Sequence, residues 1–329
     1  MVMFWVAVLA VSLLLYVLLD GFDLGVGILF GLTPDEERRR VMLSTVAPIW
    51  DGNETWLVVA GVVLWGAFPV VYATLLSAFY LPLLLMLAGL ILRGVAFEFR
   101  YKTERLRWIW DACFAGGSLV AAFIQGMTVG ALMEGLPVSN GQYVGGAFGW
   151  FSPFAVLCGI GLCIGYSLLG ACWLVKKSEG EVREAAYYRL HFLAIGLLAF
   201  LVIVFVYALA ANFQIMARWI EQPYLFVFPA IGAMAAVALA RSLFRREDGA
   251  PFYMVALIFA AAFGTLAISF WPYMIPFSIT INEAAAPHSS LAFMFWGAGL
   301  FVFPLMLIYT VISYSVFRGK VHSRPTTTD

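Results

Sequence analysis

Two short acidic motifs stand inside or at the edge of long apolar stretches of this chain. Asp20 and Asp23 lie within the first apolar stretch, and Asp51 and Glu54 open the second, with Asn53 between them. A carboxylate in or beside the core of a bilayer is costly unless it is solvated, paired or protonated, and such groups commonly line routes for protons or ions. The two motifs therefore point to proton or cation handling.

Asp20 and Asp23 are three residues apart, which places both on one face of a helix. Two carboxylates so close in a dry site do not both ionise easily, so we expect one of them to hold a proton near neutral pH. A proton carrier needs that property. The alternative is a structural pair that hydrogen-bonds a neighbouring helix, and position alone favours neither interpretation.

Asp51, Asn53 and Glu54 present two acceptors and one group that both donates and accepts hydrogen bonds. Three such groups can organise a chain of water molecules along which a proton moves. The alternative is that Asp51 caps the N-terminus of the second long helix by accepting backbone N–H bonds. We favour the proton-handling interpretation, and one residue can serve both purposes.

The histidines and cysteines do not form a recognisable redox or metal centre. His191, His288 and His322 are far apart along the chain, and no pairing of them suggests the two axial ligands of a haem. The four cysteines, which form no C-x-x-C pair, are Cys113, Cys158, Cys163 and Cys172. We therefore expect no catalytic or metal site in this chain, and a redox centre only in a partner protein.

The composition fixes the class of protein that must position these acids. Of 329 residues, 63% are hydrophobic and only 12% are charged, whereas soluble domains have about 25% charged residues. The chain is predicted to be an all-α polytopic membrane protein, with residues 1–329 forming a single integral membrane domain. Its formal net charge of zero gives no reason to expect nucleic acid as a partner.

Nine stretches approach the roughly 20 apolar residues that a membrane-spanning helix needs. They are residues 3–30, 49–72, 75–98, 111–134, 151–175, 191–214, 224–243, 252–274 and 289–317. The second and third stretches are separated only by the region around Pro69 and Pro82. If these two were one helix, the count would fall to eight.

The basic residues support nine spans. Eighteen of the 19 Lys and Arg residues follow an odd-numbered stretch, end one, or lie in the C-terminal tail, and Arg218 is the exception. Because Lys and Arg accumulate in cytoplasmic loops, the N-terminus is predicted outside and the C-terminus in the cytoplasm. Both acidic motifs then lie in the cytoplasmic half. Arg93, Glu98 and Arg100 are expected at the cytoplasmic interface, where snorkelling and ion pairing account for them.

Several motifs in this order resemble subunit II of the cytochrome bd quinol oxidases, a bacterial respiratory family that includes the cyanide-insensitive oxidases. The resemblance covers the whole chain. Its most specific parts are the Asp-Gly-Phe-Asp run at 20–23 and the Trp-Asp-Gly-Asn run at 50–53. The other matching stretches are residues 24–27, 47–49, 77–80 running on to Arg93, 97–100, 108–111, 272–276 and 304–309.

The resemblance implies an architecture and a partner. It implies nine transmembrane helices, arranged as two four-helix bundles plus one peripheral helix and paired with a homologous subunit I. Subunit I would carry haem b, haem d and the quinol site, so quinol and oxygen would be substrates of the complex. The resemblance is also compatible with a bound structural quinone and with a small accessory subunit that has a single span. It implies that the complex lies in the lipid of the bacterial cytoplasmic membrane.

The resemblance further implies that a cytoplasmic proton path runs partly along this subunit. The family's acids match Asp51 and either Asp20 or Asp23, and the neighbouring Asn53 and Glu54 complete the candidate pathway. We therefore expect a haem-free subunit of an enzyme that reduces oxygen to water, without a complete active site of its own. The alternative is a stand-alone proton- or cation-coupled transporter, a class that often shows inverted repeats and broken helices.

Overall fold

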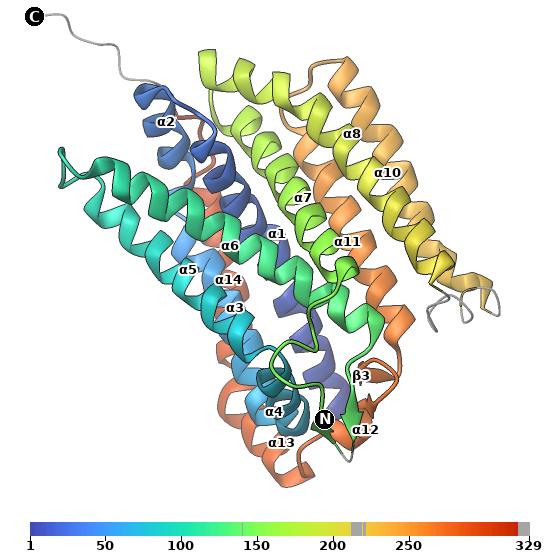
Figure 1. Cartoon of the computed structure of the whole chain (residues 1–329). Coiled ribbons are helices and arrows are strands. Elements are labelled where there is room, and N and C mark those ends of the chain that lie inside the picture. The colour runs from blue at the N-terminus through green and yellow to red at the C-terminus, as the bar shows by residue number, and fades with distance from the viewer. Residues whose placement is uncertain (140, 212–218, 220–221, 322–329) are drawn as a thin grey trace, which may run out of the picture.

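The computed structural model describes residues 1–139, 141–211, 219 and 222–321. The described chain is almost entirely helical, and its long helices run side by side (Figure 1). The helices of the N-terminal half are α1 (Val2–Gly31), α2 (Glu36–Val46), α3 (Trp50–Ala67), α4 (Pro69–Ala78), α5 (Tyr80–Phe99) and α6 (Arg107–Glu134).

The C-terminal half continues the same pattern of long helices joined by short connections. Its helices are α7 (Pro153–Lys177), α8 (Gly180–Ala210), η1 (Pro223–Phe226), α10 (Val227–Phe244), α11 (Ala250–Phe270), α12 (Ile281–Ala284), α13 (His288–Met294), η2 (Phe295–Gly299) and α14 (Val302–Val316). Two small antiparallel hairpins lie in loops: β1 (Val138–Ser139) pairs with β2 (Gln142–Tyr143), and β3 (Tyr273–Ile275) pairs with β4 (Ile279–Thr280).

Eight helical segments of the described chain are long and apolar enough to cross a membrane, and a ninth follows if the bent pair α3 and α4 counts as one span. The pair bends by 119° at Phe68, directly before Pro69. Proline lacks an N–H and disfavours helical backbone in the residue before it, which explains the break. The expected all-α membrane architecture is confirmed.

Some boundaries differ from the prediction. The second span breaks at Phe68 instead of continuing to residue 72, and the third begins at Tyr80. Helix α8 begins at Gly180, well before the predicted 191, because its first turns are polar and were not counted as span. Arg218 and Arg324, which entered the charge argument, lie outside the described residues.

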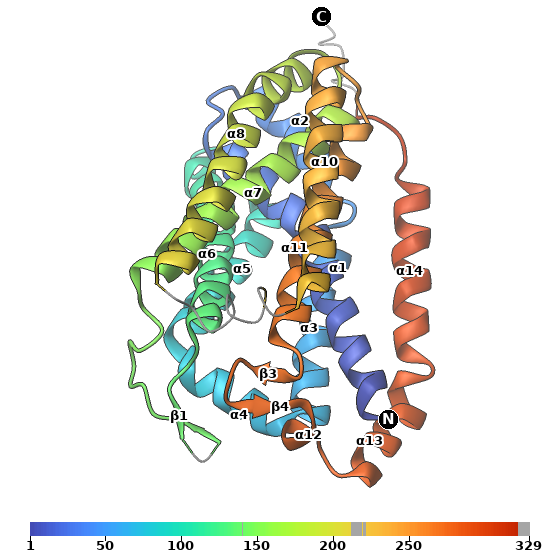
Figure 2. The ribbon, with the colours of Figure 1, turned by 90° about the vertical axis from the view of Figure 1, so that its right-hand side faces the viewer.

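The long helices form two sequential groups. Helices α1, α3, α5 and α6 pack together, as do α7, α8, α10 and α11, and the groups meet where α7 contacts α1 and α6. Helix α14 stands apart from both groups, as Figure 2 shows, and none of its residues is buried. This agrees with the two bundles and one peripheral helix that the family resemblance implied.

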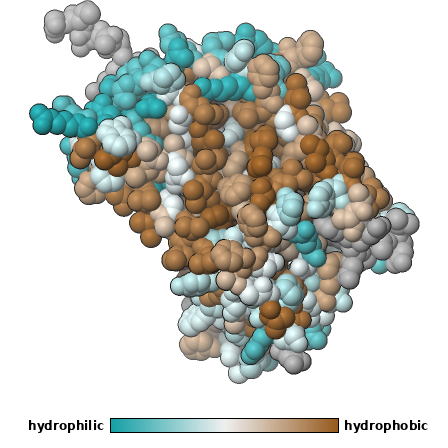
Figure 3. Space-filling view, viewed as in Figure 1, coloured by the Kyte–Doolittle hydropathy of each residue, from teal (hydrophilic) through white to brown (hydrophobic). Residues whose placement is uncertain are grey.

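The surface divides into an apolar zone and two more polar ends. Figure 3 shows hydrophobic side chains along the helices, with the most hydrophilic surface at the end where α2 lies. Helix α1 begins at the other end, and the two hairpins lie there too (Figure 2). We call the hydrophilic end the basic end, since most of the Lys and Arg residues lie in or beside the connections between α1 and α3, α5 and α6, α7 and α8, and α10 and α11.

Helices α1 and α7 approach each other through glycines. A Cβ atom added at Gly25 would lie 1.7 Å from the carbonyl oxygen of Tyr166, and one added at Gly170 would lie 2.5 Å from the carbonyl carbon of Gly25. Small residues allow such close helix packing in membranes. These glycines therefore bring the backbones of α1 and α7 into contact just beyond Asp23, and this contact joins the two bundles.

We expect Gly25→Ala to push α1 and α7 apart and to destabilise the protein by about 3 kcal/mol or more, because backbone cannot yield as a side chain can. The matched control is Gly61→Ala, since no atom lies within 4 Å of a Cβ at Gly61. Thermal unfolding of the two purified variants measures the difference. Equal unfolding temperatures would show that the α1–α7 contact is not as tight as described.

Candidate functional site

Helix α1 carries Asp20 and Asp23 into the interior, where both are completely buried. A guanidinium nitrogen of Arg93 lies 2.8 Å from Asp20 Oδ1, and another lies 3.9 Å from Asp23 Oδ2. The sequence predicted ion pairing and snorkelling for Arg93; the ion pairing is confirmed, and the snorkelling is wrong. Helix α5 continues to Phe99, so Arg93 lies well inside the helix, faces α1 and is 0% exposed instead of snorkelling to the interface.

Helix α3 adds Asn53 and Glu54 to the same place. The Asn53 Nδ2 group donates to Asp23 Oδ2 at 2.7 Å and to the Leu19 carbonyl oxygen at 3.3 Å. The Glu54 carboxylate lies 3.8 Å from Arg93 Nη1, and its side chain is 25% exposed. Glu54 is thus the member of this group that reaches the surface of the chain.

We call Asp20, Asp23, Asn53, Glu54 and Arg93 the acidic cluster. Its carboxyl groups outnumber its guanidinium three to one, so it can hold a proton in addition to the ion pairs. Among the described residues, one oxygen of each aspartate and two nitrogens of Arg93 have no hydrogen-bond partner. Buried polar atoms of this kind are normally satisfied by ordered water. The cluster therefore has the composition of a water-linked proton relay.

A second polar chain continues from the cluster into the centre of the helices. Tyr16 lies one turn before Asp20 on α1, on the same face. Gln125 of α6 donates to the Tyr16 hydroxyl at 2.7 Å and accepts a hydrogen bond from the Tyr166 hydroxyl of α7 at 2.8 Å. Sequence reasoning missed this chain. A glutamine within an apolar stretch was the signal that could have revealed it.

Asp51 lies apart from the cluster. It is exposed in this chain and sits in the first turn of α3, three residues before Glu54. The cap position of α3 is Ile49, and no side chain caps this helix, so the capping alternative for Asp51 was wrong. An acid in the first turn still benefits from the helix dipole. Of the five predicted site residues, the structure brings together Asp20, Asp23, Asn53 and Glu54.

A separate ion network surrounds the basic end of the first bundle. The buried Arg100 contacts Asp111 at 2.5 Å and Glu36 at 2.8 Å, and Arg39 contacts Asp111 at 2.9 Å. Both guanidinium groups also lie over the Phe30 ring, at 5.0 and 5.3 Å from its centroid. Asp111 is thus the counter-charge of Arg39 and Arg100. The network ties α1, α2, α5 and α6 together next to the acidic cluster.

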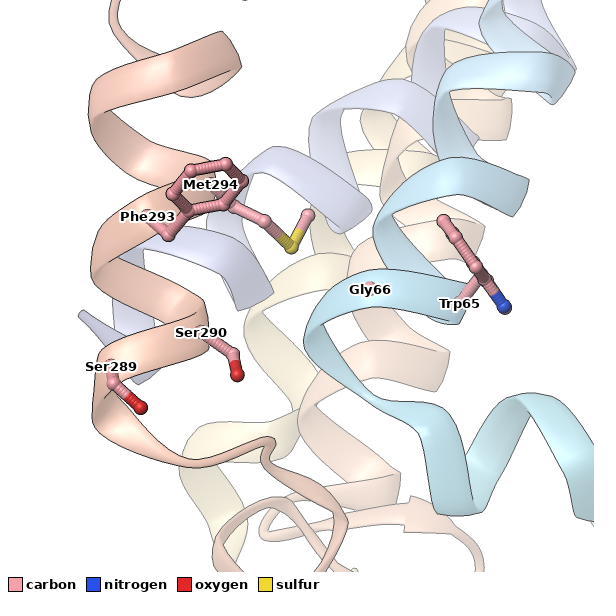
Figure 4. A pocket seen from close by; sticks show the side chains of 6 residues that line it. All are labelled: Trp65, Gly66, Ser289, Ser290, Phe293 and Met294. Carbon is pink, nitrogen blue, oxygen red and sulfur yellow. The ribbon is translucent and has the colours of Figure 1, made fainter.

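The described residues offer no competing chemical centre. No three His, Cys, Asp or Glu side chains among them are grouped so as to hold a metal ion. A shallow pocket of about 440 Å³ lies between the end of α3 and α13, and Figure 4 shows its six lining residues. They are Trp65, Gly66, Ser289, Ser290, Phe293 and Met294. Without a titratable group, this pocket has no means of handling protons.

Comparison with known proteins agrees with the architecture. The family described as "Cytochrome bd terminal oxidase subunit II" matches residues 1–317. The "Probable cytochrome oxidase subunit 2" of Haemophilus influenzae is 31% identical, with 96% of this chain and 94% of the relative covered. The "Cytochrome bd-I ubiquinol oxidase subunit 2" of Escherichia coli K12 is 30% identical, with the same shares covered.

Two further matches extend this agreement. The "Cytochrome bd ubiquinol oxidase subunit 2" of Bacillus subtilis is 30% identical over 98% of both chains. A chain in the structure of the bd oxidase from Geobacillus thermodenitrificans has the same fold, with a TM-score of 0.77 and 17% identity over 96% of both chains. The chain thus belongs to the cytochrome bd terminal oxidase subunit II family and is a membrane subunit of an oxidoreductase complex.

Proposed function

We propose that this chain is the haem-free subunit of a quinol:oxygen oxidoreductase and that it carries protons from the cytoplasm toward the oxygen-reducing partner subunit. The observation that carries the proposal is the fully buried set of Asp20, Asp23 and Arg93, whose unpartnered polar atoms lie inside a membrane protein. Buried ionisable groups in such a setting are functional by default. Family membership counts against the alternative of a stand-alone transporter.

The partner in this proposal is subunit I, which would hold haem b, haem d and the quinol site. The described histidines of this chain do not fit a haem. His191 is exposed on α8 and its Nδ1 lies 3.3 Å from the carbonyl oxygen of Tyr187 in its own helix, and His288 is exposed at the start of α13. His322 lies outside the described residues. The described histidines do not form a pair of axial haem ligands, which supports the proposal that the partner subunit holds the haems.

The proposed location is the bacterial cytoplasmic membrane, with residues 1–329 as one integral membrane domain. The basic end would face the cytoplasm, because Lys and Arg accumulate on that side of short loops. Asp20 is 18 residues from the start of α1, so the acidic cluster would lie about 27 Å along that helix, in the cytoplasmic half.

A route through the chain follows from these positions. Asp51 is exposed at the first turn of α3, and Glu54 lies one turn further along, in contact with Arg93. A proton would enter at Asp51, pass to Glu54 and reach the buried pair Asp20 and Asp23. The exposed fraction of Glu54 supports its place between the surface and the buried acids.

Asp51→Asn tests the entry to this route. We expect the complex to assemble with unchanged haem b and haem d bands in its reduced-minus-oxidised spectrum. Its oxygen consumption should fall by roughly tenfold, or about 1.4 kcal/mol in the barrier, because the amide cannot carry a proton. The matched control is Glu98→Gln, an exposed acid paired with Lys102 near the same end. An unchanged rate per haem in Asp51→Asn would remove Asp51 from the proposed path.

A further inference from the structure

Helix α14 reaches the acidic cluster through one side chain, Tyr314. The Tyr314 hydroxyl donates to Asn53 Oδ1 at 2.9 Å. Its ring lies against Phe22 and Trp173, with centroid distances of 6.5 and 6.1 Å. Since no residue of α14 is buried to the extent of a core residue, this polar contact is unusual for a helix that stands at the edge of the protein.

The hydrogen bond from Tyr314 affects the orientation of the Asn53 side-chain amide. Asn53 Nδ2 donates to Asp23 and to the Leu19 carbonyl oxygen, whereas Asn53 Oδ1 accepts from Tyr314. A flipped amide would point its oxygen at two acceptors and its NH₂ group at a hydroxyl. Tyr314 supplies the only hydrogen bond to Asn53 Oδ1 among the described residues. The phenol therefore helps to keep the NH₂ group directed at Asp23.

Tyr314 is held in turn by the segment that follows α14. We call residues 317–321 the C-terminal clasp. Lys177 Nζ donates to the carbonyl oxygens of Phe317 and Gly319, and the backbone N–H of Val321 donates to the Lys177 carbonyl oxygen at 2.7 Å. These bonds fix the end of α14 to the end of α7, three residues beyond Tyr314.

An ion pair on the surface secures the same clasp. Lys320 Nζ lies 2.8 Å from Asp248 Oδ2, and Arg183 lies 2.6 Å from Asp248 Oδ1. Partial burial alone would raise the pKa of Asp248, but the hydrogen bonds from Arg183 and Lys320 outweigh it and lower that pKa. Asp248 therefore stays ionised over the whole neutral range, and the clasp remains charged and closed there.

We propose that Tyr314 is a positioning residue of the proton path, which fixes the Asn53 amide against Asp23 and is itself held in place by the C-terminal clasp. This inference rests on the proposed function of the acidic cluster. It assigns a role to α14, which packs outside both bundles, and it places one hydroxyl group between the surface of this chain and the buried acids.

The effect of Tyr314 on proton transfer depends on the groups that face Asp23. These are Asp20 on its own helix, Arg93 of α5, Asn53 and Glu54 of α3, and Tyr314 of α14. Tyr166 of α7 is hydrogen-bonded to Gln125. An N–H bond to the ionised carboxylate favours the charged form. Losing the fixed amide should thus make Asp23 keep its proton to higher pH.

The test is the pH dependence of oxygen consumption by the purified complex carrying Tyr314→Phe, which retains the aromatic packing. We expect the alkaline limb of the profile to move upward by roughly half a pH unit, a threefold change in the proton equilibrium. Lys320→Ala, which opens the clasp, should give a smaller shift in the same direction. The matched control is Ser315→Ala, because within the described chain the Ser315 hydroxyl bonds only the Ile312 carbonyl of its own helix. The loss of this hydroxyl should leave the profile unchanged.

Two outcomes would overturn the inference. One is a Tyr314→Phe profile that superimposes on that of the unmodified complex. The other is a uniform loss of rate at every pH, which would mean that Tyr314 contributes only to packing. Asp23→Asn in parallel separates this inference from the proposed function: if it lowers the rate while Tyr314→Phe does not shift the profile, only the positioning role fails. If Asp23→Asn has no effect, both fail.

Discussion

Replacing Asp23 by Asn is expected to lower the oxygen consumption of the complex by about a hundredfold, the lower end of what a positioned proton-transfer group contributes. The amide has nearly the shape of the carboxyl group and fills the same space between Asn53 and Arg93. It cannot release and rebind a proton. The rate should therefore fall because proton delivery slows, while the helices remain packed as before.

The measurement is oxygen uptake with an excess of reduced quinol, normalised to the haem content of the purified complex. Ser12→Ala is the matched control on the same helix, because Ser12 is buried and its hydroxyl bonds the Val8 carbonyl oxygen within α1. The control should retain the full rate. Full activity in the Asp23→Asn complex would mean that protons reach the oxygen-reducing site without this carboxyl group.

Replacing Arg93 by Met is expected to destabilise the protein by about 3–5 kcal/mol, the usual cost of removing one partner from a buried ion pair. The substitution leaves Asp20 and Asp23 buried without an ion-pair partner among the described residues. Arg93 is itself 0% exposed, so water cannot replace it without opening the contact between α1 and α5. The yield of assembled complex and its unfolding temperature should both fall.

The double variant Arg93→Met with Asp20→Asn identifies the cause. Removing the Asp20 charge should recover part of the lost stability, because the remaining cost is then one buried carboxyl group instead of two. Arg107→Met is the control, since the Arg107 side chain is 35% exposed and pairs with Glu36 at the basic end. If the double variant were no more stable than Arg93→Met alone, the charge pairing described for the cluster would be contradicted.

The span pattern was predictable because hydrophobicity and the distribution of basic residues are local properties of the sequence. Length and composition indicated nine spans, and the structure has eight long apolar helices plus the bent pair α3 and α4. The position of the bend also had a local cause in Pro69. The same local reasoning failed for Arg93. A basic residue near the end of a predicted span resembles an interfacial residue, whereas the side of α5 on which Arg93 lies brings it against Asp20 of α1.

No feature of the nearby sequence predicts the contacts that complete the cluster. Tyr314 and Asn53 are 261 residues apart in sequence, and Gln125 and Tyr16 are 109 apart. Only the packing of α14 against α3, and of α6 against α1, brings these pairs together. Asp51 shows the opposite case, because a motif that places it beside Asn53 and Glu54 in sequence leaves its side chain exposed and outside the buried cluster. Proximity in the chain does not fix proximity in the site.

The most direct test of the account is the proton uptake that accompanies a single reaction of the fully reduced complex with oxygen. The complex is reconstituted in liposomes, and a pH indicator is placed on the side of the basic end. We predict that protons are taken up from that side and that Asp23→Asn slows their uptake while the haems still become oxidised. Uptake from the opposite side, or an unchanged uptake rate in Asp23→Asn, would contradict the proposed proton path.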